Sequence, residues 1–527
     1  MRLLSFVSPI SLGWVAATAV LLLSPASTSS QTQQYEQRSP LPADARSSPP
    51  PTNLLHVRTF NSTESDACDA IGAALDSGSS SKVYRPLSLE YGHYIKHYMT
   101  SSMQLPACVF LPTSASDLSK AIKIVGQRRV RFALSSGSHA SNQGFSSTRG
   151  VHITLKGFQQ VELSSDKSYI DVGPGNIWDN VYQVLDGSGV NVVGGRVTGV
   201  GVGGFITGGG GYSWKTQQHG LTVDTLIKAD MVLPDGSLVT VSETENPDLF
   251  WAIKGGGNRF GVVYNFRLKT VSQTRQVYGG VRTYTSDQLD QVVNATYQFS
   301  KVNRDPKAQV IPTFNFVLGQ PGVSLLGFYD ADEVPTTALS AFDQGNVRSF
   351  SDGWKLQSFP DFVQSSPANL TGNQRGAFHT VSLQRYSLGL LNLIVDEMKK
   401  YGKLGLLHSG TFVSYDVEPF LPYSSKAKSS AWPHSTNALP LNIYFAWLNP
   451  LDDAFWHEAI QKTAKFITAA AISEGQKLDD LYLYPNYAVT GTDPVSIYGS
   501  QSLERLGQIK RKVDPEDVMG LTTYFDF

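Results

Sequence analysis

Cysteine is scarce in this chain of 527 residues, which contains only two. Two cysteines exclude a disulfide-dense scaffold and a cysteine-rich metal site. An excess of charge is also missing, because 43 basic side chains face 44 acidic ones and the formal net charge is −1. Nucleic-acid binding needs clustered lysine and arginine to neutralise phosphates, so no nucleic-acid partner is expected.

Several short catalytic motifs are absent as well. The sequence has no G-x-S-x-G elbow, no H-E-x-x-H pair and no G-x-x-x-x-G-K-[ST] loop, which removes the commonest hydrolase, zinc-protease and P-loop classes. His93 and His97 lie four residues apart, but Gly92 interrupts a helix there and no acidic ligand accompanies them, so no metal site is expected. Apolar residues make up 41% and aromatic residues 11% of the chain, enough for large buried cores.

The N-terminal segment has the pattern of a secretory signal peptide, which we assign to residues 1–26. Arg2 is followed by an apolar stretch at 10–23 and then by small residues around Ala26. The apolar stretch is shorter than the ~20 residues that span a bilayer, so an uncleaved anchor is the weaker alternative and no stable membrane partner is expected. Residues 27–53 are rich in proline and serine, a composition that is typical of a linker. We therefore expect the protein to enter the secretory pathway and to be secreted.

The two cysteines fit an exported protein. Cys68 and Cys108 can pair in an oxidising lumen, while two buried free thiols are the alternative. Three Asn-x-Ser/Thr tripeptides predict surface glycosylation at Asn61, Asn294 and Asn369.

The pattern of short apolar runs predicts an α+β fold without regular strand–helix alternation. Apolar side chains at helical spacing predict a helix at 116–126, and Asp235-Gly236 divides two strand-like runs as a hairpin turn does. Strands are expected in this first part of the chain at 130–134, 152–155, 169–172, 227–233 and 262–268.

The chain changes character after about residue 275. Glycine thins out over 276–478, where strand-like runs such as 313–318 and 442–447 alternate with helical ones such as 391–401. We interpret this stretch as a second α+β domain with an antiparallel sheet. The remaining segment, 479–527, is expected to end in a helix near 502–512.

Glycine concentrates between Gly187 and Gly211, where it occupies twelve of twenty-five positions. Such density is tolerated where the main chain approaches a ligand closely or adopts positive φ. The run 199–204 satisfies the dinucleotide-binding fingerprint literally, and Asp224 stands where its ribose-binding acid would. We reject that interpretation, because the fingerprint must open a long amphipathic helix and four more glycines follow at 208–211.

A second loop of interest follows the expected strand at 130–134. Its Ser- and Gly-rich sequence, 135–141, presents consecutive backbone N–H groups that suit a pyrophosphate. His139 in this loop has two possible roles: its side chain either forms hydrogen bonds within the loop or is held against a cofactor. On spacing alone the first is favoured.

Together these segments resemble one family, the berberine-bridge-enzyme-like branch of the vanillyl-alcohol-oxidase flavoproteins. The resemblance rests on ordered motifs at both ends of the chain. They are Ser136–His139, Gly199–Gly211, His219–Asp224, Asp248–Gly257, Tyr484–Tyr487 and the closing helix at Leu506–Asp517.

The resemblance implies an FAD-binding domain of the PCMH type, built from two α+β subdomains, at 54–275. It also implies a substrate-binding domain at 276–478 and a C-terminal berberine-bridge-type segment at 479–527 that returns to the FAD domain. FAD is the implied cofactor. Its expected binding residues are Ser136, Gly137, Ser138, His139, Ala140, Ser141, Gly199, Val200, Gly201, Gly203 and Gly204.

The family motif implies a covalent bond between His139 and the flavin 8α-methyl group. Many members have a second link through cysteine, but the matching residue here is Val197, which offers no nucleophile, so a link through His139 only is expected. Ser138 replaces the usual glycine and could crowd the loop. Val200 matches the position at which valine leaves oxygen access to the flavin, which favours an oxidase.

Asn486 and Tyr487 match family residues beside the reacting ring and are the expected catalytic residues, with Tyr487 as the base. An ordinary phenol has a pKa near ~10, so a cation or the oxidised flavin must lower it. The sequence does not show which cation does so. A purely structural aromatic at Tyr487 is the alternative, and Tyr484 is expected to pack.

The implied reaction is hydride transfer from a substrate C–H bond to flavin N5, with O2 as the second substrate and hydrogen peroxide as a product. The expected substrate is a hydroxyl-bearing small molecule, namely a secondary metabolite whose oxidation can lead to cyclisation. An oligosaccharide is the alternative substrate. A catalytically idle, secreted flavin-binding protein is the alternative from another class, and the sequence leaves the oligomeric state open.

Overall fold

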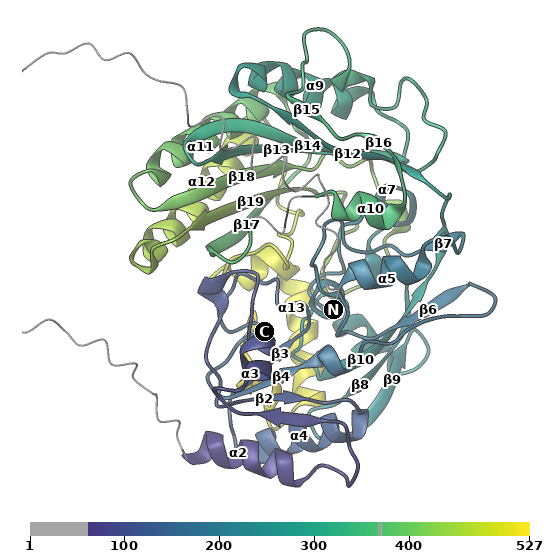
Figure 1. Ribbon diagram of the computed structural model, residues 1–527, viewed down its shortest axis with the longest axis vertical. Coiled ribbons are helices and arrows are strands. Elements are labelled where there is room, and N and C mark those ends of the chain that lie inside the picture. The colour runs from purple at the N-terminus through teal and green to yellow at the C-terminus, as the bar shows by residue number, and fades with distance from the viewer. Residues whose placement is uncertain (1–61, 367, 369–370) are drawn as a thin grey trace, which may run out of the picture. The chain divides into compact units, whose positions relative to one another are not determined.

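The computed structural model describes residues 62–366, 368 and 371–527 (Figure 1). The expected signal peptide, the linker and the acceptors Asn61 and Asn369 lie outside the described residues. The third acceptor, Asn294, is exposed on a helix of the second domain. Three sheets organise the described chain, together with a two-stranded pair, β7 (Val190–Asn191) and β11 (Val271–Ser272).

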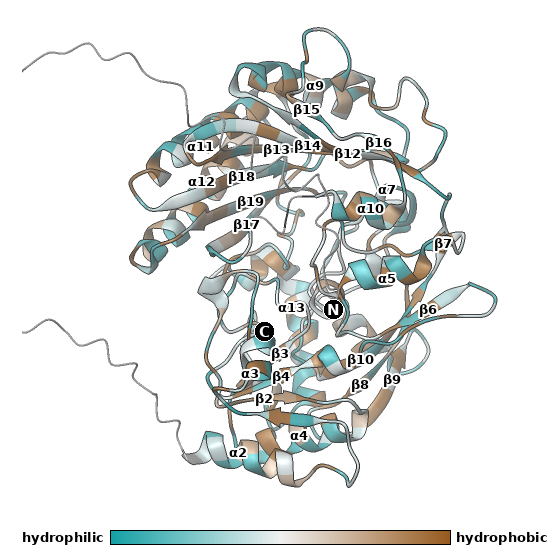
Figure 2. Ribbon diagram, in the orientation of Figure 1, coloured by the Kyte–Doolittle hydropathy of each residue, from teal (hydrophilic) through white to brown (hydrophobic). Residues whose placement is uncertain are grey.

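The first sheet has the order β1-β2-β4-β3, and its last three strands are parallel. Helix α4 (Ala115–Gln127) begins at Ser114, whose hydroxyl accepts a hydrogen bond from the N–H of Asp117. Its buried side chains include Leu118 and Val125, as the sequence pattern predicts, and Figure 2 shows both hydrophobic and hydrophilic residues along it. The elements of this part are α2 (Ser62–Ala73), β1 (Lys82–Tyr84), α3 (Leu89–Tyr94), β2 (Cys108–Leu111), β3 (Phe132–Ser135) and β4 (Val151–Thr154).

The second sheet is antiparallel, with the order β5-β6-β10-β8-β9. The predicted hairpin is present, because β8 pairs with β9 and Gly236 in the turn between them has a φ of 82°. The elements are β5 (Val161–Leu163), β6 (Tyr169–Val172), α5 (Trp178–Leu185), α6 (Val202–Thr207), α7 (Thr216–His219), β8 (Leu226–Val232), β9 (Leu238–Ser242), α8 (Pro247–Ala252) and β10 (Val262–Lys269).

The third sheet has eight strands and is antiparallel, which confirms the prediction for the second domain. Its order is β15-β12-β14-β13-β18-β19-β17, and β16 pairs with β12. Helices α9, α11 and α12 cover one face (Figure 1). The elements are β12 (Val277–Tyr284), α9 (Leu289–Val302), β13 (Ala308–Val317), β14 (Gln320–Tyr329), β15 (Ser351–Asp352), β16 (Lys355–Gln357), α10 (Phe359–Gln364), β17 (Arg375–Leu383), α11 (Leu388–Gly405), β18 (Gly410–Val417), β19 (Leu439–Trp447) and α12 (Asp453–Ser473).

Strand alternation gives the third sheet two chemically different faces. On β18, Val413, Tyr415 and Val417 enter the apolar core beneath the helices, so Ser414 and Asp416 belong to the opposite face. That opposite face is apolar at β14, where Phe328 joins a core shared with the second sheet. It becomes polar at β18 and β19, where Ser414, Asp416 and Asn442 belong to this face.

The C-terminal segment packs back on the first part of the chain. Helix α13 (Pro494–Val513) is interrupted at Gly499, which has a φ of 68°, and lies against α8. The hydroxyl of Tyr498 donates a hydrogen bond of 2.9 Å to the carbonyl of Gly255. Among the described residues, no helix is both long and apolar enough to cross a membrane.

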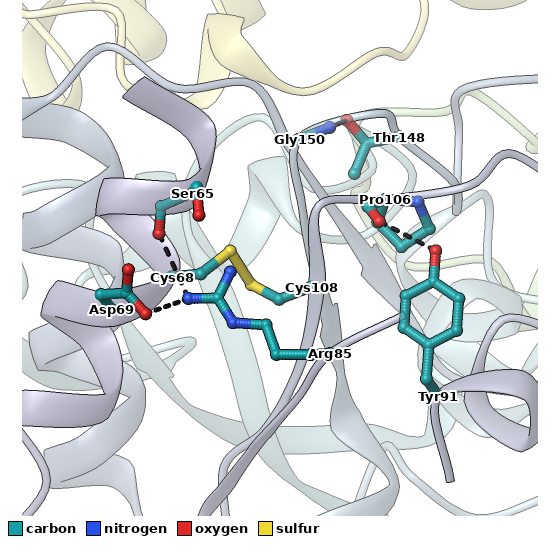
Figure 3. Close-up of a disulfide and its surroundings, with 9 residues drawn as sticks. All are labelled: Ser65, Cys68, Asp69, Arg85, Tyr91, Pro106, Cys108, Thr148 and Gly150. Atoms are coloured by element: carbon teal, nitrogen blue, oxygen red, sulfur yellow. Dashed lines mark hydrogen bonds and ion pairs between the residues drawn. A yellow bond between two sulfur atoms is a disulfide. The ribbon is translucent and has the colours of Figure 1, made fainter. Parts of the chain in front are cut away.

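Cys68 and Cys108 form a disulfide that joins α2 to β2 (Figure 3). Both side chains are buried in the core of the first sheet. The bond joins residues 40 positions apart and ties the N-terminal helix to the sheet. The sequence-based pairing is therefore the one observed.

Removing this bond should destabilise the first sheet. We expect the Cys68→Ala/Cys108→Ala variant to lose about 4 kcal/mol of unfolding free energy, because an unconstrained loop of this size gains chain entropy on unfolding. Urea unfolding measures the change. A reductant should shift the wild type in the same direction and leave the double variant unchanged, and an unshifted wild type would contradict a structural role.

Candidate active site

Two loops of the first domain meet at a pair of glycines. A Cβ atom placed on Gly137 would lie 2.5 Å from the backbone nitrogen of Gly201, so neither position accepts a side chain without movement. The hydroxyl of Ser136 donates to the carbonyl of Pro174 at 2.5 Å and accepts from the N–H of Gly203 at 3.2 Å. The loop at 136–141 and the N-terminal end of α6 are thereby fixed together.

The loop at 136–141 leaves backbone donors free. Within the part of the chain that the structure describes, the N–H groups of Gly137, Ser138, Ala140 and Ser141 donate to no residue. Ser138 has a φ of 54°, a left-handed conformation that glycine adopts more readily. Free consecutive donors form a nest for an anion such as a pyrophosphate, so the loop fits the cofactor that the sequence motif implies.

His139 lies against two aromatic rings, which are also close to one another, with their centroids 6.3 Å apart. Its imidazole stacks on Tyr98 with ring centroids 4.0 Å apart and on Phe378 of β17 at 5.9 Å, with both pairs within 12° of parallel. Burial lowers the pKa of His139 to about 4, so the ring is neutral near neutrality. Its Nε2 atom is buried without a hydrogen-bond partner. An oriented, neutral imidazole with a free nitrogen fits covalent attachment to a flavin.

The third sheet supplies part of this loop's support. The hydroxyl of Ser141 accepts a 3.1 Å hydrogen bond from the N–H of Phe378. Asn142 then binds the C-terminal segment through the carbonyl of Ala488 and the N–H of Thr490. The attachment loop therefore lies where three parts of the chain converge.

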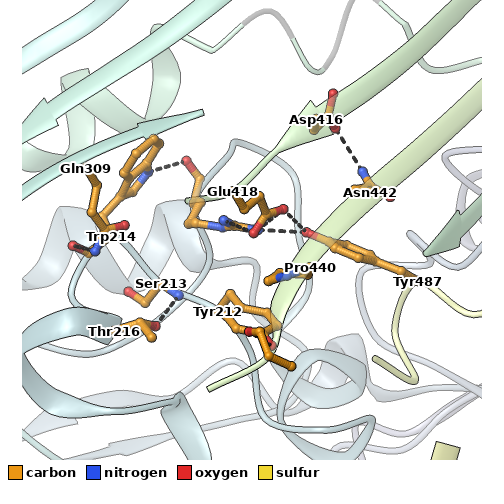
Figure 4. Close-up of polar contacts among 12 residues, drawn as sticks. Tyr212, Ser213, Trp214, Thr216, Gln309, Asp416, Glu418, Pro440, Asn442 and Tyr487 are labelled. Carbon is orange, nitrogen blue, oxygen red and sulfur yellow. Dashed lines mark hydrogen bonds and ion pairs between the residues drawn. The ribbon is translucent and has the colours of Figure 1, made fainter. Parts of the chain in front are cut away.

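Tyr487 contacts a buried ion pair (Figure 4). Arg196, from the glycine tract, binds both oxygens of Glu418 at 2.5 and 2.9 Å, and Glu418 directly follows β18. Arg196 also donates to the Tyr487 hydroxyl at 2.7 Å, and that hydroxyl lies 3.3 Å from Oε1 of Glu418. Arginine, carboxylate and phenol thus form a closed set of hydrogen bonds.

Burial and the neighbouring charges have opposing effects on the pKa values of Tyr487 and Glu418. Burial raises the pKa of Tyr487 well above the ordinary phenol value, Arg196 lowers it and Glu418 raises it. Burial also raises the pKa of Glu418, while Arg196 opposes that rise. The cation that the sequence left unidentified is therefore Arg196. Because the positive charge of Arg196 is largely balanced by Glu418, the phenol of Tyr487 keeps its proton near neutral pH. A carboxylate oxygen of Glu418 lies within hydrogen-bonding distance of that hydroxyl.

Asn486 serves the glycine tract rather than the ion pair. Its amide donates to the carbonyl of Phe205 on α6 at 3.1 Å and to the Tyr484 hydroxyl at 3.0 Å. A Cβ atom on Gly208 would lie 2.0 Å from the Asn486 carbonyl oxygen, so this glycine is required for the close approach. Tyr484 meets the Tyr487 ring edge-on at 4.9 Å, as expected of a packing residue.

Known proteins share both the sequence and the fold. A family model described as FAD binding domain matches residues 106–242. An FAD-dependent monooxygenase of Arthrobotrys oligospora is 32% identical over 432 residues, which cover 78% of this chain and 80% of the relative. The chain belongs to the berberine-bridge-enzyme-like FAD-linked oxidoreductases.

Solved structures of this family agree with the fold. A berberine-bridge-enzyme-like protein of Physcomitrella patens, in its D396N variant, superposes with a TM-score of 0.73 at 18% identity, over 87% of this chain and 98% of that one. Glucooligosaccharide oxidase of Acremonium strictum superposes with a TM-score of 0.71 at 20% identity, over 86% of this chain and 97% of that one. The flavin of that oxidase is named as cysteinyl- and histidyl-linked. The FAD-binding family model and the relative of 32% identity show that this chain is an FAD-dependent enzyme of the oxidoreductase class.

The sequence motifs found some of the site's residues and missed others. His139, Tyr487 and the two glycine-containing loops came from motifs that are local in sequence. Arg196 and Glu418 did not, because their contact joins residues 222 positions apart. A charged side chain inside a glycine tract was the one available signal, and it pointed to Arg196 alone.

The buried ion pair should be sensitive to the loss of one partner. Arg196→Met should lower the free energy of unfolding by about 3–5 kcal/mol, because Glu418 would remain as an unpaired buried charge. Chemical denaturation of the FAD-loaded protein measures it. Arg267→Met is the control, since the Arg267–Asp171 pair is partly exposed and should contribute about 1 kcal/mol or less. Equal losses in both variants would contradict the assignment.

Proposed function

We propose that this chain is a secreted FAD-linked oxidase that oxidises a hydroxyl-bearing small molecule, with O2 as electron acceptor and hydrogen peroxide as product. The main support for this proposal is the contact of Tyr487 with Arg196 and Glu418. In it, the carboxylate of Glu418 can accept a proton from the Tyr487 hydroxyl, to which Arg196 donates a hydrogen bond. Export is supported by the N-terminal sequence pattern and by the disulfide.

The cofactor is held by the first domain. The free N–H groups of the 136–141 loop suit the pyrophosphate, and His139 is positioned for a single covalent link because Val197 cannot supply a second. When bound, FAD supplies the two-electron oxidation, which amino-acid side chains cannot perform. Val200 lies at the N-terminal end of α6, and its modest size supports access for oxygen.

The protein residues move the proton of the substrate hydroxyl. Tyr487 has a raised pKa and carries its own proton, so it cannot act as a free phenolate base. It accepts the substrate proton as it passes its own to Oε1 of Glu418, 3.3 Å away. Arg196 holds both groups in place and stabilises the negative charge on the phenol oxygen during the transfer.

A secondary metabolite is the favoured substrate. The relative of 32% identity is named as an FAD-dependent monooxygenase, and on the sheet face near His139 the ring of Tyr444 contacts those of Phe378 and Phe412. An oligosaccharide is the second candidate, favoured by the polar side chains that β18 and β19 add to the same face. A screen of alcohols and saccharides with peroxide detection separates the two, and peroxide from neither would support the catalytically idle alternative.

The His139 link has a direct test. Acid-precipitated wild type should keep its yellow colour, and His139→Ala should release all bound flavin, because alanine offers no nucleophile. Absorbance of the pellet and the supernatant measures the covalent fraction. Complete release from the wild type would show that the flavin is bound only by contacts.

Removing the phenol hydroxyl should slow catalysis without loss of FAD. Tyr487→Phe should reduce the rate of flavin reduction about 10²- to 10⁴-fold, the range for loss of a general acid–base group. Anaerobic stopped-flow absorbance with the best alcohol of the screen measures the rate. Tyr482→Phe, whose ring packs against Gly499, is the control. Equal rates in Tyr487→Phe and the control would remove Tyr487 from the mechanism.

A further inference from the structure

A row of polar side chains crosses the open face of the third sheet. The strand register pairs Asp416 of β18 with Asn442 of β19, and Asn442 in turn with Thr380 of β17. The three residues thus stand side by side on adjacent strands, each about 4.8 Å from the next. We call Asp416, Asn442 and Thr380 the acceptor row.

Each member of the acceptor row has an oxygen atom without a partner. The Asn442 amide donates to Oδ2 of Asp416 at 2.9 Å (Figure 4). Oδ1 of Asp416, Oδ1 of Asn442 and Oγ1 of Thr380 are buried and bind nothing within the described residues. A buried polar atom left unpaired costs about 1–3 kcal/mol, so three in one row indicate that a ligand provides the missing donors.

The row lies within the proposed catalytic site. Phe378, two residues before Thr380 on the same strand face, stacks on His139. Glu418, two residues after Asp416, contacts Tyr487. Because alternate residues of a strand are about 6.5–7 Å apart, the row is displaced by that distance from the proton acceptor at Glu418.

Among the residues that the structure describes, no basic group forms an ion pair with Asp416. Burial and the acidic Glu418 raise the pKa of Asp416 to about 6, while hydrogen bonds from the side chains of Asn442, Thr313 and Ser414 lower it. The titratable groups that in turn feel its charge are Tyr98, Tyr386, Tyr444 and Tyr487. A carboxylate with a free oxygen and only neutral or acidic surroundings has its strongest interaction with a hydrogen-bond donor.

We propose that the acceptor row binds a second hydroxyl of the substrate, several bonds away from the hydroxyl that is oxidised. The substrate class is accordingly a small molecule with two well-separated hydroxyl groups, rather than a simple mono-alcohol. This inference rests on the proposed function, because it takes Tyr487 and Glu418 as the place where the reacting hydroxyl binds.

The test uses a matched pair of ligands that cannot be oxidised. In 4-hydroxybenzamide the amide end cannot give up a hydride, and the para hydroxyl offers a donor at the required distance. In 4-methoxybenzamide that donor is replaced by a methyl ether. Calorimetric titration of the FAD-loaded protein then gives two dissociation constants without turnover.

The wild type should bind the hydroxyl compound about ten-fold more tightly, as one hydrogen bond to a charged acceptor allows. Asp416→Asn and Thr380→Val should each reduce this preference, Asp416→Asn to about three-fold or less, since a neutral acceptor binds a donor more weakly. Ser324→Ala on β14, which lies on the same face outside the row, should keep the wild-type preference.

A purely structural role would weaken both ligands equally and leave their ratio unchanged. An unchanged ratio in both row variants, or no binding of either compound to the wild type, would overturn the acceptor row as a substrate site. The outcome is independent of catalysis. If the ratio responds as expected while no alcohol reduces the flavin, the row stands and the proposed oxidase function fails.

Discussion

The buried contact among Arg196, Glu418 and Tyr487 is the constraint on which the rest of the site depends. Each residue comes from a different part of the chain: the glycine tract, the end of β18 and the C-terminal segment. Removing two charges from water is unfavourable unless their geometry and remaining hydrogen bonds are satisfied. The ion pair therefore stabilises the fold only when the three segments bring Arg196, Glu418 and Tyr487 within hydrogen-bonding distance of one another.

The glycines make this meeting possible. Gly137 and Gly201 allow two backbone loops to cross at a distance that any side chain would prevent. Gly208 gives room to Asn486, which in turn fixes the segment that carries Tyr487. The entropy that glycine loses on folding is thus offset by contacts that no other residue type permits. Rigid backbone then presents free N–H groups and one neutral imidazole, which suit the binding of FAD.

The sequence predicted the local features of this fold well. The helix at 116–126, the strand at 169–172 and the hairpin around Gly236 depend on periodicity or on turn chemistry within a few residues. The disulfide followed from having only two cysteines. The Arg196–Glu418 pair could not be predicted in this way, because neither residue has a local pattern and their separation in sequence is 222 positions. His139 lies between these cases, since its spacing favoured a loop histidine and only the family motifs marked it as functional.

The balance of charge in the site constrains how it handles protons. One arginine faces two carboxylates and a phenol, and Arg196 is already bound by Glu418. A phenolate at Tyr487 would add a negative charge to a buried region in which Arg196 is already paired with Glu418, and burial and Glu418 both raise its pKa. In the proposed reaction, a proton that leaves the substrate is therefore matched by one that passes from Tyr487 to Glu418. Arg196 forms no ion pair with Asp416, whose hydrogen-bond partners are neutral side chains, so in our proposal this second carboxylate holds the substrate and does not take its proton.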